Sequence, residues 1–346
     1  MFALALVALC PARAAEGPVE LAAGIFEFMA PDVAGNVAGN SIAVIMQSDV
    51  LVFDATLLPR TATSLINELK MLTPLPVHYL VNSHWHPDHT GGNAGIVAAF
   101  PDVEIIASRE TRRLMEDTAT VYVRTLEYES AQANQQITQE LKSGKSADGK
   151  RLTARDREDL RAELLAEDRF LAEYKAAQRP LPTLTFDKTL TLFHGGRELR
   201  FLTLAGHTAG DVVLYMPAEK VLLTGDLLSF PVPYCADSHP QAWIASLELL
   251  SELDASTIVP GHGPAQYDKQ YLTMVLESLK SIRQRVRDAL HQGLTFKETV
   301  KAVNLDAIRL KFTHDDADLN ASFYGNFTPI LRQMYDEATE GLELYQ

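Results

Sequence analysis

The sequence has 346 residues, with 31 Lys and Arg against 45 Asp and Glu, and its formal net charge is −14 with His neutral. With 47% hydrophobic and 22% charged residues, it has an ordinary globular composition, which excludes long disorder, collagen-like repeats and coiled-coil arrays. The acidic excess repels phosphate backbones, so we expect no nucleic-acid partner. Cys10 and Cys235 are too few for a disulfide framework or a four-thiolate zinc site, so any metal must be held by nitrogen and oxygen.

The first residues have the pattern of a signal peptide. An apolar run from Met1 to Cys10, too short to span a bilayer, precedes Ala12-Arg13-Ala14, an Ala-x-Ala cleavage pattern. We expect residues 1–14 to be removed and the mature protein to be periplasmic or secreted. Because no basic residue precedes the apolar run, an upstream start or an apolar N-terminal strand is the alternative. No later stretch has the length and apolarity of a membrane-spanning helix, so we expect no membrane insertion.

Strand and helix patterns alternate along much of the chain. Short β-branched and apolar runs bounded by turn residues predict strands, and apolar residues at helical spacing predict helices. The first two strands are close enough to form a hairpin. The predicted strands are 41–46, 50–54, 77–81, 103–107, 184–186, 190–193, 199–204, 212–216, 221–223 and 256–259, and the predicted helices among them include 61–72 and 241–252.

Two helical regions interrupt or follow this alternation. From about Thr120 to about 180 the chain is densely charged, and Leu160, Leu164 and Leu171 lie on one helical stripe. We expect a helical insertion there that serves as a substrate lid or as the dimerisation arm of a homodimer, because long segments between core elements are usually functional or linkers. Residues 266–346 predict a C-terminal helical extension.

Candidate metal ligands are concentrated in four loops that each follow an apolar strand. The segment 84–89, with sequence His-Trp-His-Pro-Asp-His, places three imidazoles and one carboxylate within six residues. Three further loops each place one candidate beside a glycine: His207, Asp226 and His262. Imidazole nitrogens and carboxylate oxygens are ligands that zinc accepts, and imidazole-rich sites also accept iron. The pattern therefore predicts a metal site.

These motifs together resemble the metallo-β-lactamase fold superfamily of metal-dependent hydrolases, over about residues 23 to 263. The resemblance implies an α/β fold, a four-layer αβ/βα sandwich within residues 15–265, with the metals at one edge of two stacked sheets. It also implies two zinc ions per chain, with iron as the alternative. The implied ligands are His84, His86 and His207 at a first site, Asp88, His89 and His262 at a second, and Asp226 as the bridge between them.

Four residues near these ligands receive further roles. The resemblance places Asp54 behind the ligands, where its carboxylate would accept a ring N–H and fix the tautomer of a histidine; a turn carboxylate at a strand end is the alternative. Asp88 is the expected catalytic residue, which orients water or receives its proton. Trp85 and Tyr234 are candidate substrate contacts, with packing in the loop or in the core as the alternative for each.

The resemblance implies a metallo-hydrolase that uses a metal-bridging hydroxide on an ester, lactone, thioester or amide bond of a small molecule, and the N-terminal pattern adds that this hydrolase is exported. Two dications that share a water lower its pKa from about 15.7 toward neutrality, which supplies a nucleophile at neutral pH. Three alternatives remain open at this point: a zinc β-lactamase of the third subclass, a mononuclear iron persulfide dioxygenase-like oxidoreductase, and an inactive binding module of the same fold. Asp226, where the first β-lactamase subclass often carries Cys, argues against that subclass.

Overall fold

The structure is a computed structural model that describes residues 17–29, 32–33 and 36–343. The expected signal peptide and Cys10 lie outside these residues. The strands are β1 (Val19–Ala22), β2 (Ile25–Phe28), β3 (Ser41–Ile45), β4 (Val50–Phe53), β5 (Val77–Val81), β6 (Glu104–Ser108), β7 (Leu184–Phe186), β8 (Thr189–His194), β9 (Arg197–Leu204), β10 (Asp211–Met216), β11 (Val221–Ser229) and β12 (Thr257–His262).

Helices separate and follow these strands. None of the helices among the described residues is long and apolar enough to cross a membrane. The helices are α1 (Pro59–Leu72), α2 (Pro87–Thr90), α3 (Asn93–Ala99), α4 (Arg109–Ser143), α5 (Ala154–Ala176), α6 (Pro240–Glu252), α7 (Gln270–His291), α8 (Phe296–Ala302), α9 (Asp306–Thr313), α10 (Ala317–Ser322), the π-helix η1 (Phe323–Phe327) and α11 (Ile330–Glu343).

The strands form two sheets. The first has the order β1-β2-β3-β4-β5-β6-β7, and the second has the order β12-β11-β10-β9-β8. The predicted hairpin is confirmed, since β3 and β4 pair antiparallel with Ile42 opposite Phe53. From β4 to β7 the strands run parallel, as do β11 and β12. Parallel neighbours bring their carboxyl ends to the same edge, where loops can converge.

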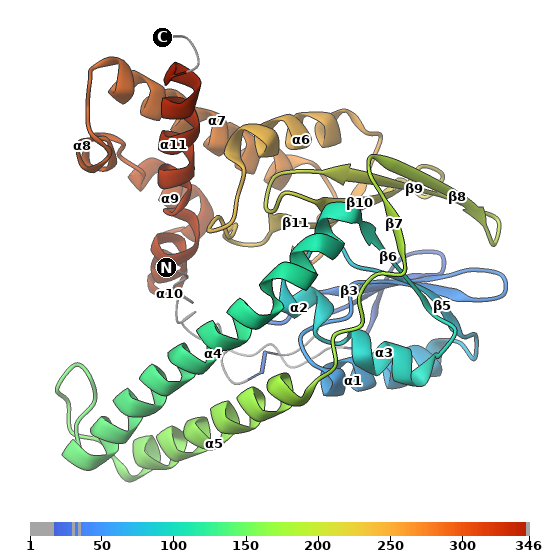
Figure 1. Ribbon diagram of the computed structural model, residues 1–346, viewed down its shortest axis with the longest axis horizontal. Coiled ribbons are helices and arrows are strands. Elements are labelled where there is room, and N and C mark those ends of the chain that lie inside the picture. Colours follow the sequence, from blue (N-terminus) through green and yellow to red (C-terminus); the bar gives the residue numbers. More distant parts are fainter. Residues whose placement is uncertain (1–16, 30–31, 34–35, 344–346) are drawn as a thin grey trace.

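The sheets stack face to face, and helices cover both outer faces (Figure 1). Between the sheets, Phe53 and Ile106 of the first belong to one buried cluster with Phe201 of the second. Helices α1 and α3 cover the first sheet, and α6 and α7 cover the second. Burying apolar side chains on both faces of each sheet explains why these strands read as continuous apolar runs. The four-layer sandwich implied by the resemblance is confirmed.

The helical insertion is a long antiparallel hairpin of α4 and α5 that projects from the sandwich (Figure 1). The Ser108 side chain caps α4 by accepting from the Thr111 amide, and Gly144, with φ +71°, ends it in the left-handed region. The helix begins at Arg109, earlier than the predicted start near Thr120. The buried hydroxyls of Ser108 and Thr111 both donate to the Gly210 carbonyl, so the start of α4 is held on the core before the helix projects from it.

The predicted C-terminal helices are present and pack against the second sheet side of the sandwich (Figure 1). Residues of α7, α9, η1 and α11 share one buried cluster with α6 and β11, and Trp243 and Phe327 in it are fully buried. The extension is therefore packed on the same core as the strand that carries Asp226.

Candidate metal centre

The predicted metal ligands come together at one edge of the sandwich. His84 and His86 follow β5, Asp88 and His89 lie in the short helix α2, and His207 lies between β9 and β10. Two predictions of local structure were wrong: Asp226 and His262 do not lie in loops, because β11 continues to Ser229 and β12 to His262. The register of β11 against β12 shifts around Gly225, and this irregularity turns the Asp226 carboxylate toward the other ligands.

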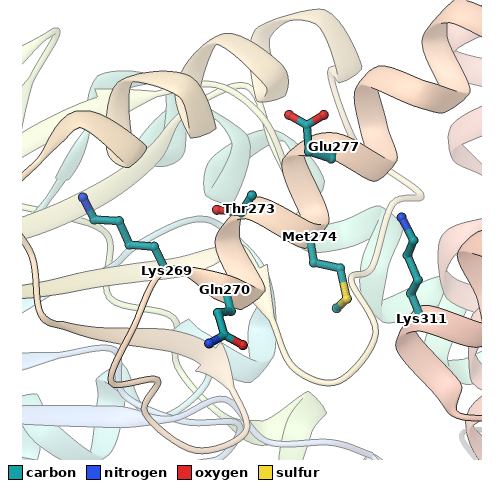
Figure 2. A pocket seen from close by; sticks show the side chains of 6 residues that line it. All are labelled: Lys269, Gln270, Thr273, Met274, Glu277 and Lys311. Atoms are coloured by element: carbon teal, nitrogen blue, oxygen red, sulfur yellow. The ribbon is translucent and has the colours of Figure 1, made fainter.

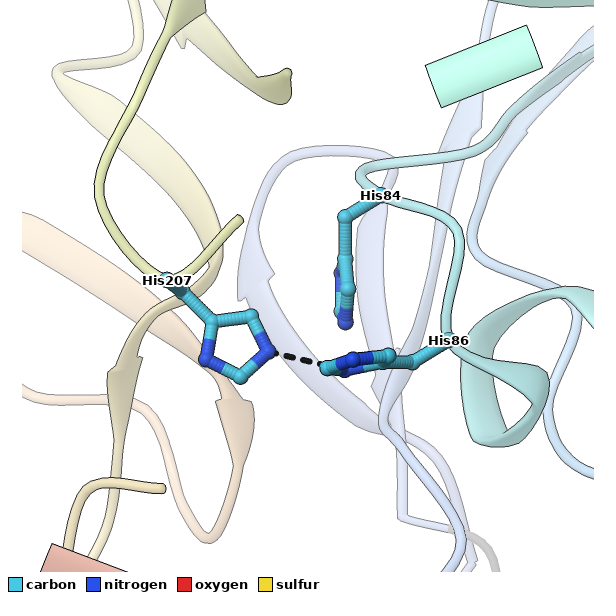
Figure 3. Close-up of side chains that lie close together, drawn as sticks. All are labelled: His84, His86 and His207. Atoms are coloured by element: carbon cyan, nitrogen blue, oxygen red, sulfur yellow. Dashed lines mark hydrogen bonds between the residues drawn. The ribbon is translucent and has the colours of Figure 1, made fainter. Parts of the chain in front are cut away.

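His84, His86 and His207 form the first group, with one ring nitrogen of each within 4.8 Å of the others (Figure 3). His207 Nε2 lies 2.9 Å from His86 Nδ1. The Nε2 atom of His84 is buried and has no hydrogen-bond partner among the described residues. Each ring donates its other N–H elsewhere, so three nitrogen lone pairs converge on one point.

Asp88, His89, Asp226 and His262 form the second group, also within 4.8 Å. His262 Nε2 lies 3.2 Å from His89 Nε2 and 3.0 Å from an oxygen of Asp88. The Asp226 carboxylate lies between the two groups: its Oδ2 is 3.4 Å from His262 Nε2 and 3.6 Å from His207 Nε2. A Cβ at Gly261 would lie 1.9 Å from Asp226 Oδ1, so a glycine is required there for the carboxylate to occupy this position.

The electrostatics of the two groups differ in the metal-free protein. In the first, burial and neighbouring imidazoles lower the pKa of His84, and burial lowers the pKa of His207 to about 4, so both rings are neutral. In the second, burial opposes charge, but Asp226 and Asp88 raise the pKa of His262 to about 10. The negative charges of Asp88 and Asp226, which favour a proton on His262, would equally favour a metal cation at the second group.

Asp54 lies beside both groups and is hydrogen-bonded to His89 and Ser83. Its carboxylate is 1% exposed and accepts from His89 Nδ1 at 2.9 Å and from the Ser83 hydroxyl at 2.7 Å. Since the Ser83 hydroxyl donates to Asp54, it accepts from His84 Nδ1, 2.9 Å away. One carboxylate therefore fixes a histidine tautomer in each group, directly in one and through Ser83 in the other.

Two carboxylates near the first group, Asp237 and Asp211, were missed by the sequence analysis. The Asp237 carboxylate accepts from His86 Nε2 at 3.1 Å, and burial, which opposes ionisation, is outweighed by His86, so the pKa of Asp237 is lowered. Asp211 accepts from the amide and hydroxyl of Thr208 and closes the turn after His207. Burial raises the pKa of Asp211 to about 7. Asp237 lies 151 residues from His86 and outside any motif, so no sequence pattern marks it.

Aromatic side chains surround the first group. Trp85 meets His86 edge to face at a centroid distance of 4.4 Å, and the Tyr234 ring lies 6.0 Å from His86 and 5.9 Å from His207. Tyr122 of α4, which the sequence did not indicate, lies 6.5 Å from Trp85 and within electrostatic reach of Asp88 and Tyr234. The insertion thus contributes a phenol to the surroundings of the metal centre.

The hydrogen bonds and the spacing of the histidine rings fit the binding of metal ions. The rings of His86, His89 and His207 each donate one N–H to a carboxylate or carbonyl, so their other nitrogens face inward as lone pairs. In the first group, two lone pairs only 2.9 Å apart repel each other unless a cation lies between them. In the second group, His89 Nε2 and His262 Nε2 lie 3.2 Å apart in the negative field of Asp88 and Asp226, which a cation can occupy in place of a proton. Two nitrogens bound to one zinc at 2.0–2.1 Å in a tetrahedron are roughly 3.3 Å apart, close to these separations.

A separate surface pocket lies along α7, with a volume of about 570 Å³ (Figure 2). Its lining residues are Lys269, Gln270, Thr273, Met274, Glu277 and Lys311. None of the six belongs to either metal group. The Lys269 ammonium is already bonded to the carbonyls of Ser251 and Leu253 at the end of α6, so it serves the structure rather than a ligand.

Comparison with known proteins agrees with this geometry. The family model for the metallo-beta-lactamase superfamily matches residues 34–262, and the chain therefore belongs to this superfamily. A linear primary-alkylsulfatase from Pseudomonas sp. (strain ATCC 19151) is 27% identical over 281 residues, which are 78% of this chain and 49% of the relative.

Solved structures extend the comparison. The stereoselective inverting sec-alkylsulfatase Pisa1 from Pseudomonas sp. is 18% identical with a TM-score of 0.62, over 93% of this chain and 50% of its own. A metallo-beta-lactamase from Pontibacter korlensis is 19% identical with a TM-score of 0.54, over 76% of this chain and 98% of its own. At these identities the likeness concerns the fold. The chain spans about half the length of the alkylsulfatases that it matches.

Proposed function

We propose that this protein binds two zinc ions in the two groups and hydrolyses an ester bond of a small molecule, with alkyl sulfate esters as the first substrate class. The observation that carries the proposal is the position of Asp226, whose carboxylate faces His207 of the first group and His262 of the second. A shared carboxylate favours two ions held side by side, because its charge offsets their mutual repulsion.

The bound ions would supply an activated water at neutral pH and a positive charge for the developing anion. The residues of the chain have separate tasks. His84, His86 and His207 hold one ion, and Asp88, His89 and His262 hold the other. The Asp88 side chain is 23% exposed whereas that of Asp226 is 4% exposed, so Asp88 is the carboxylate that can orient water and take its proton.

Two observations support a sulfate ester of an apolar alcohol. The similarity to Pisa1 covers 93% of this chain, so it reaches beyond the residues matched by the family model, into the helical regions. Trp85, Tyr122 and Tyr234 also offer apolar ring faces beside the metal groups for a hydrocarbon chain. In the proposed reaction, water and the ester give the alcohol and hydrogen sulfate. The roles of Trp85 and Tyr234 as substrate contacts belong to this proposal.

A substrate panel tests the proposal. Zinc-reconstituted protein would be assayed with octyl sulfate, nitrocefin, a lactone and a thioester, beside an Asp88→Asn variant. We expect sulfate release from octyl sulfate that falls at least about a hundredfold in the variant. Turnover of nitrocefin alone would favour the β-lactamase alternative. If zinc is bound and none of the four compounds is hydrolysed, the proposal is contradicted and a binding module is favoured. Oxidation of a persulfide by iron-loaded protein would favour the dioxygenase alternative.

Export and self-association complete the proposal. The apolar run before Ala12-Arg13-Ala14 supports removal of residues 1–14 and a periplasmic or secreted protein. Val121 on α4 and Leu165 on α5, 53% and 58% exposed, support a homodimer through the insertion. N-terminal sequencing of protein from the producing cell tests the removal of residues 1–14. Light scattering of the wild type and of a Leu165→Glu variant tests the homodimer. A monomer mass for both proteins would contradict it.

A further inference from the structure

We propose that the C-terminal helices control the first metal site through one loop, residues 230–239 between β11 and α6, and that Asp237 in this loop is a positioning residue for His86. This inference rests on the proposed binding of metal ions by the two groups. The 230–239 loop is in contact with the imidazoles on one side and with the extension on the other.

On its inner side, the 230–239 loop accepts hydrogen bonds from two ligands of the first group. The Tyr234 carbonyl accepts from His207 Nδ1 at 3.1 Å, and the Asp237 carboxylate accepts from His86 Nε2 at 3.1 Å. These bonds leave His207 Nε2 and His86 Nδ1 unprotonated and 2.9 Å apart. The loop therefore sets both the tautomer and the orientation of two of the three imidazoles.

On its outer side, the same loop is held by the C-terminal helices. The Cys235 amide donates to the Asn326 carbonyl of η1 at 2.8 Å, and Gln333 Nε2 of α11 donates to the Ala236 carbonyl at 2.6 Å. The Cys235 side chain is fully buried in the cluster that contains Phe327. The helices thus contact the two residues that lie between Tyr234 and Asp237, and they fix the spacing of the two acceptors.

The bonding of Asp237 separates its role from a general structural one. Among the described residues, its carboxylate hydrogen-bonds to His86 alone. The side chain is 21% exposed, so its removal leaves no large cavity. We therefore expect the loss of Asp237 to change the metal site far more than the free energy of unfolding. The first site also depends on residues beyond 262, where the family model ends.

Cobalt titration tests the inference with the full chain. An Asp88→Ala background weakens the second site and isolates the first, whose Co²⁺ affinity and visible spectrum are then measured. We expect Asp237→Ala to weaken Co²⁺ binding about 10- to 100-fold. Asp237→Asn should recover most of the affinity, because its amide oxygen still accepts from His86. Gln333→Ala should weaken Co²⁺ binding about threefold. Gln284→Ala, an exposed α7 glutamine bonded to Asp288, is the matched control and should leave the affinity unchanged.

The outcomes distinguish the two proposals. If the background protein binds no Co²⁺ or Zn²⁺, the proposed function itself fails. If it binds Co²⁺ and Asp237→Ala binds with the same affinity and spectrum, the positioning role of Asp237 is overturned. Equal affinities for Gln333→Ala and Gln284→Ala overturn the role of the extension. The unfolding temperature of each metal-free variant should lie within about 2 °C of that of the Asp88→Ala background protein. A larger fall in the unfolding temperature of Asp237→Ala, with no recovery in Asp237→Asn, would assign Asp237 a structural role instead.

Discussion

Asp54 and His89 lie at the centre of the candidate site as a buried pair, with Oδ2 of the carboxylate 2.9 Å from Nδ1 of the imidazole. The Ser83 hydroxyl, bonded to the same carboxylate oxygen, also contacts His84. Asp54 has φ +64°, in the left-handed region that Asp and Asn tolerate better than other side chains. A strained strand end thus places one carboxylate behind a histidine of each metal group.

Replacement of Asp54 should weaken both metal sites. Asp54→Asn keeps the size and the backbone preference but removes the charge that makes His89 and His84 stronger ligands. We expect the Zn²⁺ affinity of each site to fall about 10- to 100-fold, measured by competition with a chelator. Asp49→Asn is a control at another buried aspartate, which is bonded to His194 away from the ligands. Unchanged zinc affinity in Asp54→Asn would contradict the orienting role.

Asp226→Ala should remove the second ion first. The change takes away the charge that offsets repulsion between two dications, while the first site keeps its three imidazoles. We expect about one zinc ion per chain and a loss of activity of at least about a hundredfold, measured by elemental analysis and sulfate release. Asp226→Cys, which supplies a thiolate, should retain more metal than the alanine variant and change substrate preference. Wild-type turnover and two ions in Asp226→Ala would show that the carboxylate is not a bridge.

Glu27 should make the stability of the metal-free protein fall as the pH rises. Burial, opposed by the Ala265 amide, raises its pKa to about 7, and the residue is 2% exposed. Between about pH 4.5 and about pH 7 the folded state therefore holds a proton that the unfolded state releases, so stability is lost across this window. Glu27→Gln removes the effect and keeps an acceptor for Asn40.

The variant should therefore gain stability relative to wild type as the pH rises, by up to about 3 kcal/mol above pH 7. Urea unfolding in the presence of a chelator, at about pH 5 and about pH 8, measures the difference. A difference between Glu27→Gln and wild type that is the same at both pH values would contradict the assignment.

Tyr122 tests the contribution of the insertion to substrate binding. If its ring contacts the hydrocarbon chain, Tyr122→Ala should raise KM for octyl sulfate about tenfold and leave zinc content unchanged, while Tyr122→Phe should change KM much less. Tyr128→Ala, on the same helix and 66% exposed, is the matched control. Equal KM values for Tyr122→Ala and Tyr128→Ala would show that α4 does not line the substrate site.

The sequence predicted most of the strands, the sandwich and the clustering of the ligands, because these depend on local signals, but it missed β1 and β2. Apolar runs marked β5 and β12, and the residues placed at or near their ends met at one edge of the sheets. Asp226 inside β11 was misplaced, because the register shift against β12 depends on pairing between strands. Asp237 and Tyr122 carried no pattern, since each reaches the site only through the packing of a loop or of a long helix.

The measurement that tests the central claim most directly is the number of metal ions per chain. Protein stripped with a chelator and returned to zinc would be analysed for metal after removal of unbound ions. The two groups of ligands predict two zinc ions per chain and a higher unfolding temperature in their presence. A stoichiometry near zero with all ligands intact would contradict the account, and a single ion identified as iron would instead favour the mononuclear oxidoreductase.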